Sequence, residues 1–166
     1  GQAIGSTAVH STGAHDVSLP LLDPARPLLI PENIENWGRD SEIAKTEVYL
    51  FHALRESAIA RLFAHNPWIV SYIRSAITEY GRGIRIDLDA ITRQGVTEEG
   101  FTIALDKGIF TPDETPAQKE ALAKLETVLA LVDGWADEVA SKAAGDRLPS
   151  LIALRELHRR ARAEQT

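Results

Sequence analysis

Apolar residues recur at helical spacing along the stretch from Lys45 to Ala64. They lie three, four or seven residues apart, at Val48, Phe51, Ala58 and Leu62. Such spacing places them on one side of a helix, so the pattern predicts a single amphipathic helix over Lys45 to Ala64. Asp40 or Ser41 can cap its start. Asn66-Pro67 ends it, because a residue before proline is pushed out of the helical conformation.

Three further long helices are predicted after this one. The first runs from Pro67 to Tyr80 and stops at Gly81-Arg82-Gly83. A capping box, Thr115-Pro116-Ala117-Gln118, opens the second, which ends at Gly145. Pro149 starts the last helix.

Strand signals are few. Leu28-Leu29-Ile30, before a proline, suits a short strand. The alternation over Ile84 to Ile91 allows either a short strand or a short helix, and Gly95 to Gly108 suits a further short helix. The expected fold class is mainly α (α+β), with four to five helices and a small sheet or single short strands.

Length and composition indicate one globular domain over residues 1–166. Of the 166 residues, 44% are hydrophobic and 25% are charged, which is ordinary for a folded domain. No apolar run approaches the roughly 18 residues that cross a bilayer, so no membrane partner is expected. There is no cysteine, which excludes disulfides and thiolate metal ligands and fits a cytoplasmic location. There is no methionine either, and we expect the chain to be a piece of a longer one.

The charge balance argues against a nucleic-acid partner. The net charge is -6, which disfavours a broad phosphate-binding surface. One basic cluster stands out near the end, at Arg155, Arg159, Arg160 and Arg162. We interpret it as a helix face in contact with water.

Candidate chemistry centres on Arg55, Glu56 and Ile59, which share one side of the Lys45–Ala64 helix. In a zinc peptidase these three places hold His, Glu and His. The two imidazoles bind the metal, and the glutamate takes a proton from the metal-bound water. Here the glutamate is present and both histidine places hold other residues.

A set of motifs in the same order resembles the zincin-like hydrolases of actinobacteria. That family is described as zinc-dependent metalloproteases, or as associated with deazaflavin-coenzyme biosynthesis. The likeness covers nearly the whole chain. Its motifs are Gly1-Gln2-Ala3-Ile4-Gly5, Leu19-Pro20-Leu21-Leu22, Pro31-Glu32-Asn33-Ile34, Leu54-Arg55-Glu56, Arg61-Leu62-Phe63-Ala64-His65, Pro67-Trp68, Glu79-Tyr80, Arg82-Gly83-Ile84, Leu125-Glu126-Thr127 and Leu131-Val132-Asp133-Gly134-Trp135.

The resemblance implies a zincin-like fold in which zinc is the family cofactor. It aligns the two metal-binding histidines with Arg55 and Ile59, and the general base with Glu56. It aligns the third metal ligand with Asp133, or alternatively with Glu79. These residues would line the cleft, with Arg55 and Glu56 at its floor.

The ligand chemistry at these places disfavours zinc. Ile59 has no lone pair, and Arg55 has only donors and a fixed positive charge. Arg55 is instead expected to pair with Asp133 or Glu79. We expect no metal, with His52, Glu56 and Asp133 as the alternative ligand set. His52 is otherwise interpreted as a half-buried helix histidine with one ring nitrogen hydrogen-bonded.

Three functions stay open at this point. The first is a non-catalytic protein that binds a peptide or protein partner in the former cleft. The second is an active metal-dependent hydrolase that uses His52 and Glu56 with Asp133 or Glu79. The third is a structural or assembly domain. An exposed apolar surface around Trp68 and Trp135 would favour the first over the third.

Overall fold

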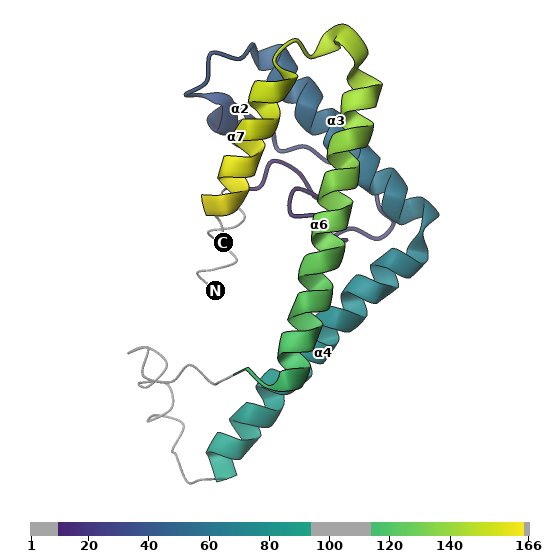
Figure 1. The fold of residues 1–166 in the computed structure, drawn as a ribbon, viewed down its shortest axis with the longest axis vertical. Coiled ribbons are helices and arrows are strands. Elements are labelled where there is room, and N and C mark those ends of the chain that lie inside the picture. Colours follow the sequence, from purple (N-terminus) through teal and green to yellow (C-terminus); the bar gives the residue numbers. More distant parts are fainter. Residues whose placement is uncertain (1–9, 94–113, 165–166) are drawn as a thin grey trace. The chain divides into compact units, whose positions relative to one another are not determined.

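The computed structural model describes residues 10–93 and 114–164. These residues form a chain of helices joined by loops (Figure 1). The helices are α2 (Pro31–Gly38), α3 (Lys45–His65), α4 (Pro67–Arg93), α6 (Pro116–Ala144), the short 3-10 helix η1 (Gly145–Arg147) and α7 (Leu151–Glu164). The prediction of a mainly helical protein is confirmed. None of these helices combines the length and apolar composition that crossing a bilayer requires.

The contacts divide the chain into two compact units. The first unit comprises the residues up to Val70 together with those from Leu129 onward. It therefore holds α2, α3, the last part of α6, and α7. The second unit, Ser71–Val128, holds most of α4 and the first part of α6.

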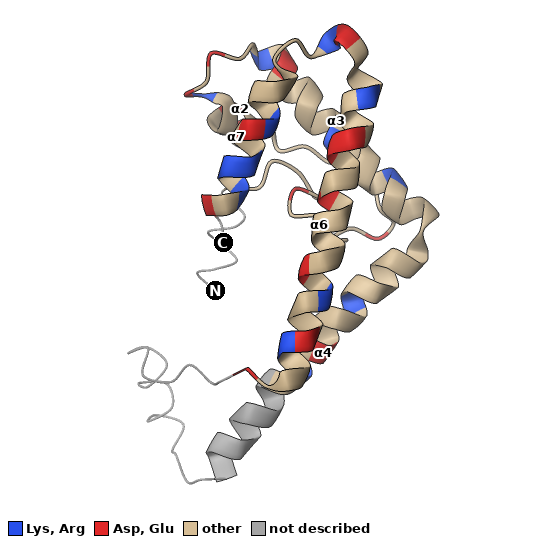
Figure 2. Cartoon of the chain, viewed as in Figure 1, with Lys and Arg blue, Asp and Glu red and all other residues tan. Residues whose placement is uncertain are grey.

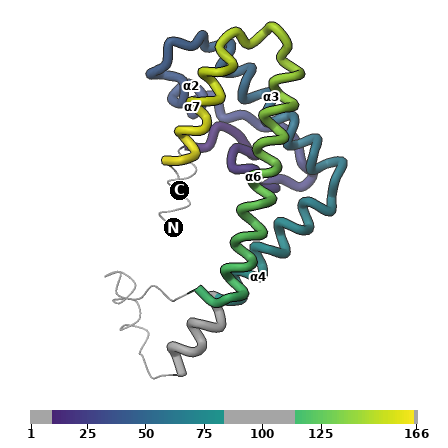
Figure 3. Tube along the Cα trace, viewed as in Figure 1, coloured from purple at the N-terminus to yellow at the C-terminus, as the bar shows by residue number. Residues whose placement is uncertain are grey.

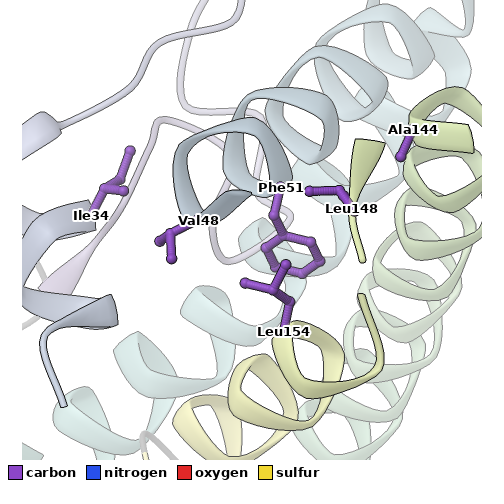
Figure 4. Packing of buried hydrophobic residues seen from close by; sticks show 6 residues of the cluster. All are labelled: Ile34, Val48, Phe51, Ala144, Leu148 and Leu154. Carbon is purple, nitrogen blue, oxygen red and sulfur yellow. The ribbon is translucent and has the colours of Figure 1, made fainter. Parts of the chain in front are cut away.

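The core of the first unit forms where α3 meets α2 and α7. It consists of Ile34 on α2, Val48 and Phe51 on α3, Ala144 on α6, Leu148, and Leu154 on α7. Figure 4 shows the Phe51 ring directed at Leu154. Phe51 is 1% exposed and Leu154 is fully buried. Apolar burial of this kind is the main favourable term in folding, so this cluster fixes α7 on α3.

An irregular segment, residues 10–30, completes the first unit (Figure 3). Its two ends meet at a single antiparallel bridge between Gly13 and Leu29. Ile30 N–H donates to the Thr12 carbonyl oxygen at 2.8 Å, and Ala14 N–H donates to the Leu28 carbonyl oxygen at 3.2 Å. The strand predicted at Leu28-Leu29-Ile30 is thus reduced to this bridge. The small sheet is not found within residues 10–93 and 114–164.

Helix α3 has the predicted position, but it is not amphipathic in the simple sense. Its buried side chains occupy more than half of its circumference, because α2, α7 and segment 10–30 all contact it. Neither Asp40 nor Ser41 caps it. Its N-cap is Ala44, without a side-chain hydrogen bond, and the Ser41 hydroxyl donates instead to the Gly38 carbonyl oxygen at the end of α2.

The predicted ends of α3 and α6 are confirmed. Pro67 begins α4 directly after Asn66, and Gly145 ends α6 with a φ of +55°, a conformation that favours glycine. The last helix begins at Leu151 rather than at Pro149. Ser150 directly precedes this helix, and the Glu47 carboxylate on α3 accepts hydrogen bonds from Ser150 N–H at 2.8 Å and Ser150 Oγ at 3.0 Å.

In the second unit the capping box is confirmed and the predicted stop of α4 is wrong. Thr115 N–H donates to Gln118 Oε1 at 2.9 Å, and Gln118 N–H donates to Thr115 Oγ1 at 3.2 Å. Helix α4 continues through Gly81 and Gly83 to Arg93, so Ile84 to Ile91 is helical. A Cβ on Gly83 would clash with the Gln118 side chain. This glycine therefore permits a close approach rather than ending the helix. The short helix predicted over Gly95 to Gly108 lies outside the described residues.

Candidate functional site

The three motif residues lie together on α3 and all of them are buried. Arg55 is 5% exposed, Glu56 4% and Ile59 1%. Arg55 and Ile59 lie one turn apart on one side of the helix, as predicted, and Glu56 lies next to Arg55. Burying two charged side chains is costly unless each finds partners, so those partners define what the site can do.

Segment 10–30 contacts both carboxylate oxygens of Glu56 through hydrogen bonds. Its Oε1 accepts from Leu28 N–H at 3.1 Å and lies 2.8 Å from His15 Nδ1, while its Oε2 accepts from His15 N–H at 3.0 Å. Both carboxylate oxygens are thereby bonded to protein groups. The carboxylate fastens the segment to α3.

Gly13 makes this arrangement possible. A Cβ at this position would lie 2.6 Å from the Leu28 carbonyl oxygen and 2.8 Å from Glu56 Oε2. Real side chains do not approach backbone so closely, so only glycine lets the segment reach the carboxylate. The space around the motif is correspondingly small. A cavity of about 10 Å³, lined by His15, His52 and Glu56 among others, holds roughly one water-sized sphere and no peptide.

Arg55 connects α3 to α6. Its guanidinium Nη2 donates to Asp133 Oδ1 at 2.5 Å, and its Nη1 pairs with Asp137. The guanidinium carbon also lies 5.8 Å from the centre of the Phe51 ring. The predicted pair between Arg55 and Asp133 is confirmed, with Asp137 as a second carboxylate. Burial raises the pKa of Asp137, although the guanidinium beside it acts in the opposite direction.

The other candidate residues are not drawn into this network. Glu79 belongs to the second unit, where its carboxylate is 4.0 Å from Lys124 and is half exposed. His52 packs its ring edge-on against Trp37, with the centroids 4.5 Å apart. It is 5% exposed rather than half-buried, and its Nε2 has no hydrogen-bond partner among the described residues.

Two buried histidines flank Arg55. Burial, with His158 and Arg55 nearby, lowers the pKa of His52 to about 3. Burial also lowers the pKa of His158 to about 4, helped by Arg55 and Arg162 and opposed by Asp133. Both rings are therefore neutral at physiological pH.

A wider groove lies on the outer side of the Arg55 network. It has a volume of about 430 Å³ and is formed by one face each of α6 and α7. Asp133 and Asp137 line it from α6, and α7 contributes Ile152, Arg155, Glu156, His158, Arg159 and Arg162. We call this surface the α6–α7 groove. Asp133 is thus the candidate residue that lies beside an open space.

Sequence reasoning missed His15, Asp137 and His158. His15 lies in a segment without periodicity, so nothing in the sequence indicates that it meets Glu56 some forty residues later. Asp137 could have been found, because it lies four residues after Asp133 and shares its side of α6.

A family model described as zincin-like metallopeptidase matches residues 1–166. The chain belongs to that family. No curated protein and no solved structure matches the chain.

Metallopeptidase chemistry requires a metal, and the side chains at the motif positions on α3 do not fit one. Zinc needs three protein ligands with lone pairs directed at a common point. Ile59 has no lone pair. Arg55 places a positive charge beside Asp133, and both oxygens of Glu56 already bond to His15 and Leu28. Among the residues that the structure describes, no group of three His, Asp or Glu side chains is placed to hold a metal ion.

The contacts of Glu56 predict that its replacement weakens the fold. Glu56→Ala leaves the buried N–H and imidazole of His15, and the Leu28 N–H, without an acceptor, so the free energy of unfolding should fall by on the order of 3 kcal/mol in urea titrations. Hydrogen exchange should show lost protection at the amides of His15 and Leu28. Glu126→Ala, at an exposed helical position, is the control and should change stability by less than about 0.5 kcal/mol. Unchanged stability of Glu56→Ala would contradict a structural role.

The Arg55 network predicts a characteristic pattern among variants. Arg55→Met removes the buried cation between Asp133 and Asp137 and leaves only the longer contact of Arg155 with Asp137, which should cost about 3 kcal/mol of unfolding free energy. Adding Asp133→Asn and Asp137→Asn should recover most of that loss, because the uncompensated charges are then gone. A triple variant as unstable as Arg55→Met would show that packing, rather than charge, sets the cost.

The low pKa values of His52 and His158 predict acid sensitivity. The unfolded state takes up protons near pH 6.5 while both folded rings stay neutral, so stability is lost as pH falls below about 6.5. From pH 6 to pH 5 the two histidines should cost roughly 2 kcal/mol. The raised pKa of Asp137 acts in the opposite sense. Thermal unfolding of His52→Phe plus His158→Leu should show a flatter pH profile, whereas His65→Leu should match the wild type.

Proposed function

We propose that this chain is a non-catalytic member of the zincin-like metallopeptidase family that binds a peptide or protein partner. One observation supports the proposal that the chain is non-catalytic. The glutamate at the general-base position accepts hydrogen bonds from the backbone of His15 and Leu28 and from the His15 ring. A base must have a free lone pair within reach of the water that it deprotonates, and three of the roughly four acceptor positions of the Glu56 carboxylate already hold contacts with His15 and Leu28.

The Arg55 network supports the same proposal. Its guanidinium supplies the positive charge that a metal ion would bring, and it holds the carboxylate aligned with the third metal ligand. A second cation would have to displace a buried, hydrogen-bonded pair. The metal motif of this chain has accordingly become a structural connection between α3 and α6.

Exposed apolar side chains favour a binding role over a purely structural one. Trp68 is 64% exposed, Leu131 67% and Trp135 37%. Leu131 and Trp135 lie four residues apart, so they share one side of α6. Large apolar side chains gathered on a surface commonly mark sites where another protein binds.

Zinc content and peptidase activity test this proposal. The purified chain, dialysed against a weak chelator, should retain far less than one zinc ion per chain and should not cleave casein in the presence of zinc. Arg55→His plus Ile59→His restores both motif imidazoles and should raise the zinc content, with Glu126→Ala as the control. About one zinc per wild-type chain, together with chelator-sensitive cleavage, would establish the alternative, an active hydrolase with unusual ligands.

A further inference from the structure

The α6–α7 groove carries a local surplus of positive charge on an acidic chain. Three arginines and three carboxylates line it, and the carboxylates are Asp133, Asp137 and Glu156. Two more guanidiniums act on the same carboxylates, since Arg55 pairs with both aspartates and Arg160 donates to Glu156. Five guanidiniums thus meet three carboxylates, although the net charge of the chain is -6. Figure 2 marks the Lys and Arg positions of α7 in blue and its Asp and Glu positions in red.

The arginines of the groove differ in the length of their ion pairs and in the exposure of their side chains. Arg159 and Arg160 share one partner, Glu156, and hydrogen bonds from them lower the pKa of Glu156 to about 2. Arg155 has a longer contact, with its Nε 3.7 Å from Asp137 Oδ2. The side chain of Arg155 is 46% exposed and that of Arg159 is 70% exposed. Both can therefore reach a ligand in the groove without breaking the buried pair between Arg55 and Asp133.

The volume of the groove and its exposed apolar side chain indicate which class of ligand would fit. A volume of about 430 Å³ is within the range of ligand sites and accommodates a few side chains. Ile152, on the same groove, is 86% exposed. A ligand that combines a carboxylate with an adjacent apolar group would satisfy both features. Guanidinium groups recognise carboxylates through paired hydrogen bonds, as they already do here with Glu156.

We infer that the α6–α7 groove binds an acidic segment of a partner polypeptide, with Arg155 and Arg159 holding a carboxylate and Ile152 contacting a neighbouring apolar side chain. This inference rests on the proposed function, because it names the partner chemistry for the rim of the former metal site. The overall negative charge disfavours a nucleic acid as the ligand, since a long polyanion would be repelled outside the groove.

Fluorescence anisotropy with a labelled peptide of alternating glutamate and leucine tests the inference. Arg155→Gln plus Arg159→Gln should weaken binding by about tenfold or more, and Ile152→Ser by severalfold. The matched control, Arg61→Gln plus Lys142→Gln, removes the same charge from exposed positions outside the groove and should bind like the wild type. Binding should weaken with added salt, as expected of exposed charge pairs. A peptide with glutamine in place of glutamate should bind at least tenfold more weakly.

Different results would overturn the groove assignment and the non-catalytic function. Equal binding by the groove variant and the wild type, or no binding of the acidic peptide, would overturn the groove assignment, while the zinc and cleavage results would still decide whether the chain is catalytic. Cleavage of the peptide, detected by mass spectrometry, would overturn the non-catalytic function instead. Tighter binding of a single-stranded oligonucleotide than of the acidic peptide would overturn the choice of a polypeptide ligand.

Discussion

The buried guanidinium of Arg55 is the constraint on which the first unit depends. A charge at this depth must be neutralised, and the two carboxylates that neutralise it lie one turn apart on α6. The pairing therefore fixes the register of α6 against α3. It also places Asp133 and Asp137 where they line the α6–α7 groove. Replacing such a network with apolar side chains often costs little stability, so we expect its main contribution here to be the choice of one packing arrangement.

Arg55 and Glu56 are adjacent on α3 and bind different parts of the first unit. Arg55 faces α6, and Glu56 faces segment 10–30, whose backbone it holds through His15 and Leu28. The segment contains little regular structure, so few of its backbone groups are satisfied internally. A buried carboxylate with two accepting oxygens is an effective way to secure it. In a zinc peptidase the glutamate at this position takes a proton from the metal-bound water.

The sequence predicted the helices well because their signals are local. Proline after Asn66, glycine at position 145 and the Thr115–Gln118 capping box each act within one turn, and each appears as predicted. The helix stop predicted at Gly81-Arg82-Gly83 was wrong because the role of Gly83 depends on Gln118, a residue distant along the chain. At the site, the pair between Arg55 and Asp133 was predictable from the family motif. The contact between His15 and Glu56 was not, because irregular segments carry no periodicity from which their partners can be inferred.

Protein groups hold both oxygens of the Glu56 carboxylate, and the cavity beside it is about as large as one water molecule. Zinc titration of the wild-type chain, followed by the ¹H–¹⁵N resonances of the His15 and Leu28 amides, tests this arrangement most directly, because both amides donate to that carboxylate. We expect that neither resonance moves as zinc reaches one equivalent. A shift or broadening of both resonances that saturates at one equivalent would show that zinc competes for Glu56 and that the carboxylate is not reserved for segment 10–30.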